Sequence, residues 1–511
     1  MTRTEMIGQC IMVGFPGTQL DADFIALVRE YKIGNVVLFK HNVENLTQLK
    51  QLCSDIQELV LGQTGHPAFI GIDQEGGSVV RLPEDGINVP AAMALSATDD
   101  PENAYQAAAL SATQLRALGI NFNFAPSADI NTNPNNPIIG ARSFGQSAQQ
   151  VTPYVLAALR AYQEAGILAA VKHFPGHGDT SSDSHIALPC IEKTLEEIQT
   201  QELIPFQAAI DSGCQAVMTS HILFPALEPE KIPATMSRRI ITGLLREKWN
   251  FQGLVITDCM EMDAISRFYG TDKGAVRAIS AGVDMVLISH SGEKAKEAFR
   301  AIQDAVEMGN ISQQQLQTAV QRVLKRKEQY CLPPRGEAGT PQDYAKNMVL
   351  RRKTITLYHG EIPHLGRAPF FVGCADFRSG LVSNDGGTDT FAGYLGRRFD
   401  AAYLVVGKDP EPSEVCRAVE QAKRHTAIVA CTYNGHLFEG QKNLVQKLAK
   451  TGVPMMVVAL RNPYDLRFVP QDVAAVAGWD YTPMTLELIG DVLERKLIPL
   501  GKPPVDLGED E

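Results

Sequence analysis

The side chains best suited to chemistry in this chain cluster between residues 171 and 189. This segment holds three histidines, a lysine and two aspartates among glycines, prolines and serines, and it follows an apolar run. Such groups can bind a metal, transfer protons or hold a substrate. The candidates in the loop are His173, His177, Asp179, Asp183 and His185. So many titratable groups on one loop indicate a site rather than a core, but the loop alone leaves its chemistry open.

Two groups have the chemistry of catalysis by proton transfer or nucleophilic attack. Asp183 lies two residues before His185, close enough to orient the imidazole and stabilise its protonated form, so the pair can act as general acid and base. Asp258 stands where an apolar run ends, and such a carboxylate can attack an electrophilic carbon. The structural alternatives are a loop held by local Asp and Ser hydrogen bonds and a helix N-cap at Asp258. We interpret His177 and Asp179 as groups that shape the loop.

A second set of polar residues is suited to binding a sugar. Lys172 and His173 end an apolar run, and Arg81 and Arg142 follow two others. These donors can bind hydroxyls or an acetamido oxygen, while Asp73 can accept from two hydroxyls at once. An ion-pair network among Asp73, Arg81 and Arg142 is the structural alternative, and the two interpretations are compatible.

The elements that must position these groups alternate along the first 290 residues. Eight short apolar, β-branched runs cover 8–15, 35–39, 68–73, 121–126, 168–173, 215–220, 254–258 and 285–289. Stretches with apolar residues at helical spacing separate them, including 44–61, 104–118, 148–165, 195–212 and 238–248. Eight strand-helix units predict an α/β fold of the (β/α)8 TIM-barrel type. An open doubly wound sheet is the alternative.

The positions of the polar residues favour the barrel. In a barrel the active site lies at the carboxyl ends of the strands, so residues at those ends share one mouth. Six polar residues lie at or just past the ends of five of these runs: Asp73, Asp129, Lys172, His173, His221 and Asp258.

A second, smaller domain follows the predicted barrel. We assign residues 1–330 to the TIM-barrel catalytic domain, 331–341 to a Pro/Gly-rich linker and 342–511 to a C-terminal α/β sandwich domain. Buried strands are predicted at 370–373, 403–407, 427–432 and 455–460, with helices at 412–424 and 440–450. No Gly-x-Gly-x-x-Gly motif follows these strands.

Composition narrows the classes of function. The chain has 511 residues, 44% of them apolar, and a net charge of −11 without a basic block, which disfavours nucleic-acid and anionic membrane partners. Nine scattered cysteines form no Cys-x-x-Cys pair, and no signal-like or membrane-length apolar stretch occurs. We expect a cytoplasmic protein with a small-molecule partner and no cofactor or metal. The sequence carries no signal for an oligomeric state.

Four motifs together resemble the family 3 glycoside hydrolases, in their β-N-acetylglucosaminidase branch. The longest runs from Lys172 to Gly178 as Lys-His-Phe-Pro-Gly-His-Gly, followed after four residues by Asp-Ser-His. The others are Asp-Gln-Glu-Gly-Gly with a downstream Arg at 73–81, Ala-Pro-Ser-Ala-Asp-Ile-Asn at 125–131 leading to Arg-Ser-Phe, and Thr-Asp at 257–258. The resemblance covers residues 1–330 strongly and the C-terminal part in general plan.

The resemblance implies a role for each matching residue. Asp258 would be the covalent nucleophile, His185 the general acid/base and Asp183 its partner. The positions that would hold the non-reducing sugar are Asp73, Arg81, Arg142, Lys172 and His173. Two positions depart from the family pattern: Ser78 stands where an Arg is common, and the nucleophile segment continues Cys-Met.

The function expected from this resemblance is a retaining exo-β-N-acetylglucosaminidase that works through a glycosyl-Asp intermediate. Muropeptides from recycled cell wall are the expected substrates, with chitooligosaccharides and β-glucosides as others. A phosphorylase on the same fold, a zinc-dependent hydrolase using the His/Asp loop and an inactive sugar-binding barrel are the alternatives. Residues 342–511 would stabilise the enzyme, dimerise it or shape its far subsites.

Overall fold

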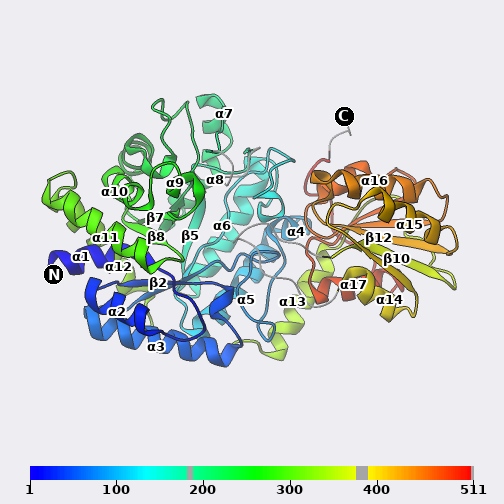
Figure 1. The fold of residues 1–511 in the computed structure, drawn as a ribbon, viewed down its shortest axis with the longest axis horizontal. Coiled ribbons are helices and arrows are strands. Elements are labelled where there is room, and N and C mark those ends of the chain that lie inside the picture. Colours follow the sequence, from blue (N-terminus) through cyan, green and yellow to red (C-terminus); the bar gives the residue numbers. More distant parts are fainter. Residues whose placement is uncertain (181–187, 376–389, 508–511) are drawn as a thin grey trace.

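Eight parallel strands close into a barrel, which confirms the predicted TIM-barrel fold and excludes the open sheet (Figure 1). The structure is a computed structural model that describes residues 1–180, 188–375 and 390–507. Neighbouring strands pair in chain order, and β1 pairs with β8 to close the ring. The strands are β1 (Ile11–Val13), β2 (Asn35–Leu38), β3 (Phe69–Ile72), β4 (Phe122–Asn123), β5 (Leu168–Phe174), β6 (Ala216–Thr219), β7 (Leu254–Cys259) and β8 (Met285–Ile288).

Helices surround the barrel, and capping residues mark where they begin and end. The helix α5 begins after Asp100, whose side chain accepts from the Glu102 amide, and it ends at Gly119 with a φ of +85°. The barrel helices are α1 (Arg3–Gln9), α2 (Ala22–Tyr31), α3 (Leu46–Thr64), α4 (Ala92–Ser96), α5 (Pro101–Leu118), α6 (Ala148–Glu164), α7 (Leu195–Thr200), α8 (Leu203–Asp211), α9 (Asp263–Ser266), α10 (Thr271–Ala281), α11 (Gly292–Glu307) and α12 (Gln313–Tyr330).

Several predicted elements differ from the structure. The run at 8–15 is a strand only over β1, because a capping box between Thr2 and Glu5 starts a helix that continues to Gln9. The predicted helix at 195–212 is two helices, α7 and α8, and the stretch at 238–248 forms a π-helix, η4 (Arg239–Lys248).

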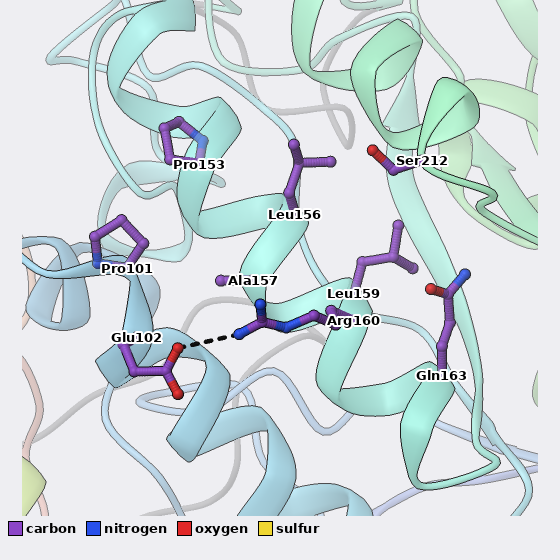
Figure 2. Close-up of a pocket in the computed structure, with 9 residues that line it drawn as sticks. All are labelled: Pro101, Glu102, Pro153, Leu156, Ala157, Leu159, Arg160, Gln163 and Ser212. Carbon is purple, nitrogen blue, oxygen red and sulfur yellow. Dashed lines mark hydrogen bonds and ion pairs between the residues drawn. The ribbon is translucent and has the colours of Figure 1, made fainter.

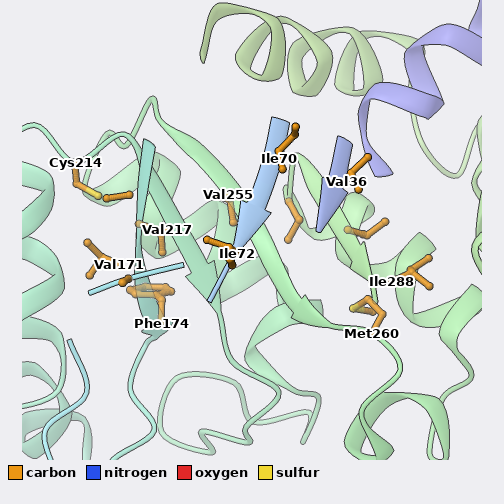
Figure 3. Packing of buried hydrophobic residues seen from close by; sticks show 14 of the residues in the cluster. Val36, Ile70, Ile72, Val171, Phe174, Cys214, Val217, Val255, Met260 and Ile288 are labelled. Atoms are coloured by element: carbon orange, nitrogen blue, oxygen red, sulfur yellow. The ribbon is translucent and has the colours of Figure 1, made fainter. Parts of the chain in front are cut away.

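The strands alternate between an inner and an outer core, as a barrel requires. Leu254 and Ile256 of β7 belong to the cluster inside the barrel, whereas Val255 packs outward against the helices (Figure 3). In β3, a Cβ at Gly71 would lie 2.7 Å from the ring of Phe124. Glycine at this position therefore leaves room inside the barrel for the ring of Phe124.

A six-stranded sheet forms the second part of the chain, which confirms the predicted smaller α/β domain. Its strand order is β11-β10-β12-β13-β14-β9, with only β9 antiparallel to its neighbour. The strands are β9 (Thr356–His359), β10 (Pro369–Cys374), β11 (Ala402–Val406), β12 (Ala427–Thr432), β13 (Met455–Ala459) and β14 (Ala474–Ala477). The helices are α13 (Pro341–Thr354), α14 (Phe391–Arg398), α15 (Pro412–Ala422), α16 (Glu439–Ala449) and α17 (Pro483–Leu493).

The two parts share an apolar interface at α4 (Figure 1). Met93 and Ala94 of α4 are fully buried and belong to the hydrophobic cluster of the second sheet rather than to that of the barrel. Ala141, from the loop after β4, joins the same cluster. In the described ranges, none of the helices has the length and apolar character needed to cross a bilayer.

Lys327 of α12 closes the barrel at the amino ends of its strands. Its Nζ donates to Gln9 Oε1 at 2.6 Å and to the Gly34 carbonyl at 2.8 Å, just before β1 and β2. Burial lowers the pKa of this ammonium to about 7. The side chain is therefore largely neutral in the folded protein at mildly alkaline pH.

This shift predicts a pH-dependent contribution to stability. In the unfolded chain Lys327 stays protonated up to about pH 10, whereas in the folded chain it loses its proton near pH 7. The folded state therefore gains stability between these values as the pH rises. Relative to Lys327→Met, the wild-type chain should gain roughly 1 kcal/mol of unfolding free energy per pH unit in that window. Urea unfolding at several pH values measures the gain, and a constant difference between the two proteins would contradict it.

Candidate active site

A buried carboxylate, Glu75, joins the ends of β3 and β5 to the loop after β4 at the mouth of the barrel. It lies just after β3 and accepts from Arg142 Nε and Nη2, both at 2.8 Å. Lys172 Nζ, on β5, lies 2.6 Å from Glu75 Oε1. Burial raises the pKa of Glu75, but the charges of Arg142 and Lys172 outweigh it and hold the pKa well below its usual range. Glu75 is therefore ionised and holds both cations.

Lys172 also binds Asp73, at the end of β3. Its Nζ donates to Asp73 Oδ1 at 2.8 Å, while Arg81 Nη2 lies 3.9 Å from Oδ2 of the same carboxylate. Burial lowers the pKa of Lys172, but Asp73 and Glu75 raise it by more than burial lowers it, so the net shift is upward. The Asp73 side chain keeps 21% of its surface exposed, against 2% for Lys172. Asp73 thus offers a carboxylate to the mouth of the barrel.

His173 is fixed by Asp129, which follows β4. Its Nδ1 lies 2.6 Å from Asp129 Oδ2, and its backbone amide donates to Oδ1 at 3.1 Å. Burial raises the pKa of Asp129, but the electrostatic attraction and hydrogen bonds of His173 outweigh it, and the pKa falls. The other ring nitrogen, Nε2, lies 3.4 Å from Arg142 Nη2. A proton on Nδ1 and a lone pair on Nε2 satisfy both contacts.

Asp258 lies at the end of β7 in the same electrostatic environment. Its Oδ1 accepts from the Cys259 amide at 2.7 Å. Burial raises the pKa of Asp258, but the imidazoles of His173 and His221 outweigh it, so the pKa lies below its ordinary value. His221, after β6, donates from Nε2 to the Cys259 carbonyl at 2.9 Å. Asp258 is therefore a half-buried, anionic carboxylate.

The loop after β5 is described only as far as Thr180. His177 is buried, which lowers the pKa of its imidazole to about 4, and its carbonyl accepts from Asn136. Asp179 accepts from Thr132 Oγ1 at 2.8 Å. Both contacts brace the loop against the segment after β4. Asp183 and His185, the predicted acid/base pair, lie outside the described residues.

The contacts differ from the predicted ion-pair network in one respect. Arg142 pairs with Glu75 rather than with Asp73, and Lys172 is the cation bound to Asp73. Neither Glu75 nor Asp129 was assigned a binding or catalytic role from the sequence. Each had a signal: Glu75 lies in the Asp-Gln-Glu-Gly-Gly motif, and Asp129 follows an apolar run. Within the described parts of the chain, no cluster of three or more His, Cys, Asp or Glu residues is placed to hold a metal ion.

A separate hollow lies on the outer helical layer, away from the strand ends (Figure 2). It is formed mainly by α5 and α6 and includes the ion pair of Glu102 with Arg160 at 3.0 Å. Both of these side chains are about half exposed, at 51% and 55%. A solvated pair of this kind has none of the perturbed groups of the barrel mouth, so we do not assign the chemistry to this hollow.

A closed parallel barrel that gathers carboxylates, cations and imidazoles at its carboxyl-end mouth has the organisation of a TIM-barrel enzyme. The profile of the glycosyl hydrolase family 3 N-terminal domain matches residues 2–326. The chain belongs to this family, and it is a glycoside hydrolase by that membership.

The relatives come from the branch expected from the motifs, which confirms the resemblance. A family 3 β-N-acetylglucosaminidase from Paenibacillus sp. str. FPU-7 is 37% identical, with a TM-score of 0.93 over 100% of both chains. Beta-hexosaminidase A of Pseudoalteromonas piscicida is 36% identical over 365 residues, 64% of this chain and 61% of that protein. This chain thus spans about three fifths of that relative. A beta-hexosaminidase of Stenotrophomonas maltophilia is 33% identical over 299 residues, 57% of this chain and 87% of its own.

The buried position of Glu75 predicts a large loss of stability on its neutralisation. Glu75→Gln leaves Arg142 and Lys172 without their shared anion, which should lower the free energy of unfolding by about 3–5 kcal/mol at neutral pH. Because the folded-state pKa of Glu75 is depressed, this difference should shrink as the pH falls below about 4. Urea unfolding measures both effects.

The matched control is Glu102→Gln, which neutralises the exposed partner of Arg160. Its expected cost is below about 1 kcal/mol, because solvent screens the pair. Equal losses in the two variants would show that Glu75 does not hold buried charge.

Proposed function

We propose that this protein is an exo-β-N-acetylglucosaminidase that hydrolyses terminal β-GlcNAc with retention of configuration. The observation that carries the proposal is Asp258, an anionic carboxylate at the end of β7 whose pKa is lowered by His173 and His221 despite burial. A nucleophile must be ionised to attack the anomeric carbon, and a buried carboxylate needs such neighbours to remain so. Family membership and the names of the relatives supply the reaction class.

Asp258 would form the covalent glycosyl intermediate. Its Oδ1 already accepts from the Cys259 amide, so we assign attack on C1 to Oδ2. The C1–Oδ2 bond forms as the bond from C1 to the leaving oxygen breaks, through an oxocarbenium-like transition state. Water then attacks C1 and releases the sugar with its β configuration restored.

The terminal sugar would be held by the groups around Lys172. The ammonium has three donors, of which Asp73 and Glu75 take two, so the third is assigned to a sugar hydroxyl. The part-exposed carboxylate of Asp73 would accept from two hydroxyls. The remaining members of the proposed binding set are Arg81, Arg142 and His173.

His185 is proposed as the general acid/base, with Asp183 as its partner. This assignment rests on the Asp-Ser-His motif, and both residues lie outside the described part of the chain. Protonated His185 would donate its proton to the leaving oxygen, and the neutral imidazole would then deprotonate the attacking water. Retention requires Asp258 and His185 to lie about 5 Å apart around the scissile bond.

The biological setting is also a proposal. We propose muropeptides from recycled cell wall as natural substrates, with chitooligosaccharides and β-glucosides as the substrates to compare. All nine cysteines are free, which fits a reducing compartment such as the cytoplasm. We retain 1–330, 331–341 and 342–511 as the proposed catalytic domain, linker and C-terminal domain.

Kinetics on glycosides with different leaving groups test the two catalytic roles. His185→Ala should slow the hydrolysis of disaccharides by about 10²–10⁴-fold, and that of p-nitrophenyl β-GlcNAc much less, because an activated phenol leaves without a proton. Asp258→Asn should abolish both activities. Steady-state rates measure these effects, with Glu102→Gln as the control that retains activity. Unchanged disaccharide hydrolysis in His185→Ala would remove the acid/base assignment.

The molecule that accepts the glycosyl group, water or phosphate, distinguishes a hydrolase from a phosphorylase. Chelation tests the metal-dependent alternative. We expect NMR to detect β-GlcNAc as the first product, at the same rate with and without inorganic phosphate or a chelator. Accumulation of sugar 1-phosphate would instead make the protein a phosphorylase. Loss of activity on chelation, restored by zinc, would favour the metal-dependent alternative.

A further inference from the structure

Two side chains of the second domain reach the loop that carries Arg142. Tyr464 and Asn462 follow β13, and Tyr464 lies in the 3₁₀ helix η6 (Pro463–Phe468). The Tyr464 hydroxyl accepts from Asn131 Nδ2 at 2.9 Å, and Asn462 Oδ1 accepts from the Ala141 amide at 2.8 Å. Asn462 and Asn131 are 2% and 1% exposed, so these bonds do not compete with solvent.

The turn before Arg142 is fixed between the two asparagines. Asn131 Oδ1 accepts from the Gly140 amide at 3.0 Å, next to the bond of Ala141 to Asn462. Gly140 has a φ of +47°, and a Cβ there would lie 2.1 Å from Asn462 Oδ1. The close approach of Asn462 thus requires glycine at this position. Asn462 is itself held, because its Nδ2 donates to Asn434 Oδ1 at 3.0 Å.

Arg142 follows Ala141 in the chain, so the position of the turn sets where the Arg142 side chain lies at the mouth of the barrel. Its guanidinium binds Glu75 through two hydrogen bonds and lies 3.4 Å from His173 Nε2. Glu75 in turn contacts Lys172. A continuous set of short, buried contacts therefore runs from Asn462 to the groups proposed to hold the sugar.

We propose that Asn462 is a positioning residue through which the second domain sets the affinity of the sugar site. It fixes the turn at 140–142 and thereby the guanidinium of Arg142, without touching the substrate. This inference rests on the proposed function in that Arg142 belongs to the sugar-binding set. It assigns the second domain a part in substrate binding through Asn462 and, by way of Asn131, through Tyr464.

A double-mutant cycle on the full chain tests the kinetic consequence. Asn462→Ala should raise the KM for p-nitrophenyl β-GlcNAc roughly 5- to 10-fold and change kcat less than about 3-fold, since positioning of ground-state contacts is lost. In an Arg142→Ala background, the same substitution should change KM less than about 2-fold, because the group it positions is gone. Equal effects in both backgrounds would overturn the proposal.

The control breaks a different bond between the two parts of the chain. Lys353 Nζ on α13 donates to Asn103 Oδ1 on α5 at 2.9 Å, a bond that does not involve the turn at 140–142. Lys353→Met should leave KM unchanged. A rise in KM equal to that of Asn462→Ala would show a general effect of the interface and overturn the specific role.

Amide hydrogen exchange gives a readout that does not depend on activity. Asn462→Ala should speed exchange at Gly140–Arg142, where the Ala141 amide loses its acceptor, and Lys353→Met should not. Unchanged exchange there would overturn the proposal even if KM rose. If the wild-type chain hydrolysed no β-GlcNAc glycoside, the proposed function would fail by itself, and exchange would still decide whether Asn462 fixes the turn.

A smaller substitution covers the case in which Asn462→Ala does not fold. Tyr464→Phe removes only the hydroxyl that accepts from Asn131. It should raise KM in the same direction by roughly 2- to 3-fold, and the rise should vanish in the Arg142→Ala background. A KM and a local exchange rate identical to those of the wild type would then overturn the proposal.

Discussion

The buried carboxylate of Glu75 is the interaction on which the mouth of the barrel depends. It binds Arg142 and Lys172 at once, and these two residues come from the loop after β4 and from β5. Removing two cations from water costs free energy that a bidentate, short-range anion can offset. Because the three partners meet only when β3, β4 and β5 are correctly paired, the network links the register of the barrel to the geometry of its site.

The same electrostatics keeps the proposed nucleophile anionic. Asp73, Glu75, Asp129 and Asp258 would repel one another strongly in a buried site without compensating charge. Lys172 and the two arginines supply it, and the pKa values of Glu75, Asp129 and Asp258 are all lowered despite burial. Groups that would bind the sugar therefore also maintain the charge state that attack requires.

Features that depend on residues close in sequence could be predicted from the sequence, whereas contacts between distant segments could not. Strand periodicity and strand-end polar residues predicted the barrel and the gathering of Asp73, Lys172, His173 and Asp258. The partner of Arg142 could not be predicted, because Asp73 and Glu75 lie two residues apart and only the loop's path selects between them. Asn462 carried no signal, since its role depends on a contact 321 residues away in the chain. The roles of Asp183 and His185 rest on motif alone.

The second domain shows why linker composition does not establish independence. The Pro/Gly-rich stretch at 331–341 separates two periodic patterns, as a linker between autonomous domains would. Yet Met93 and Ala94 of the barrel's own α4 lie in the hydrophobic cluster of the second sheet, and separating the parts would expose them to water. An interface with apolar burial and internal polar bonds such as that of Asn131 to Tyr464 is expected to hold one relative position. Because its position relative to the barrel is fixed in this way, the second domain can hold the barrel's turn at 140–142 in place through hydrogen bonds.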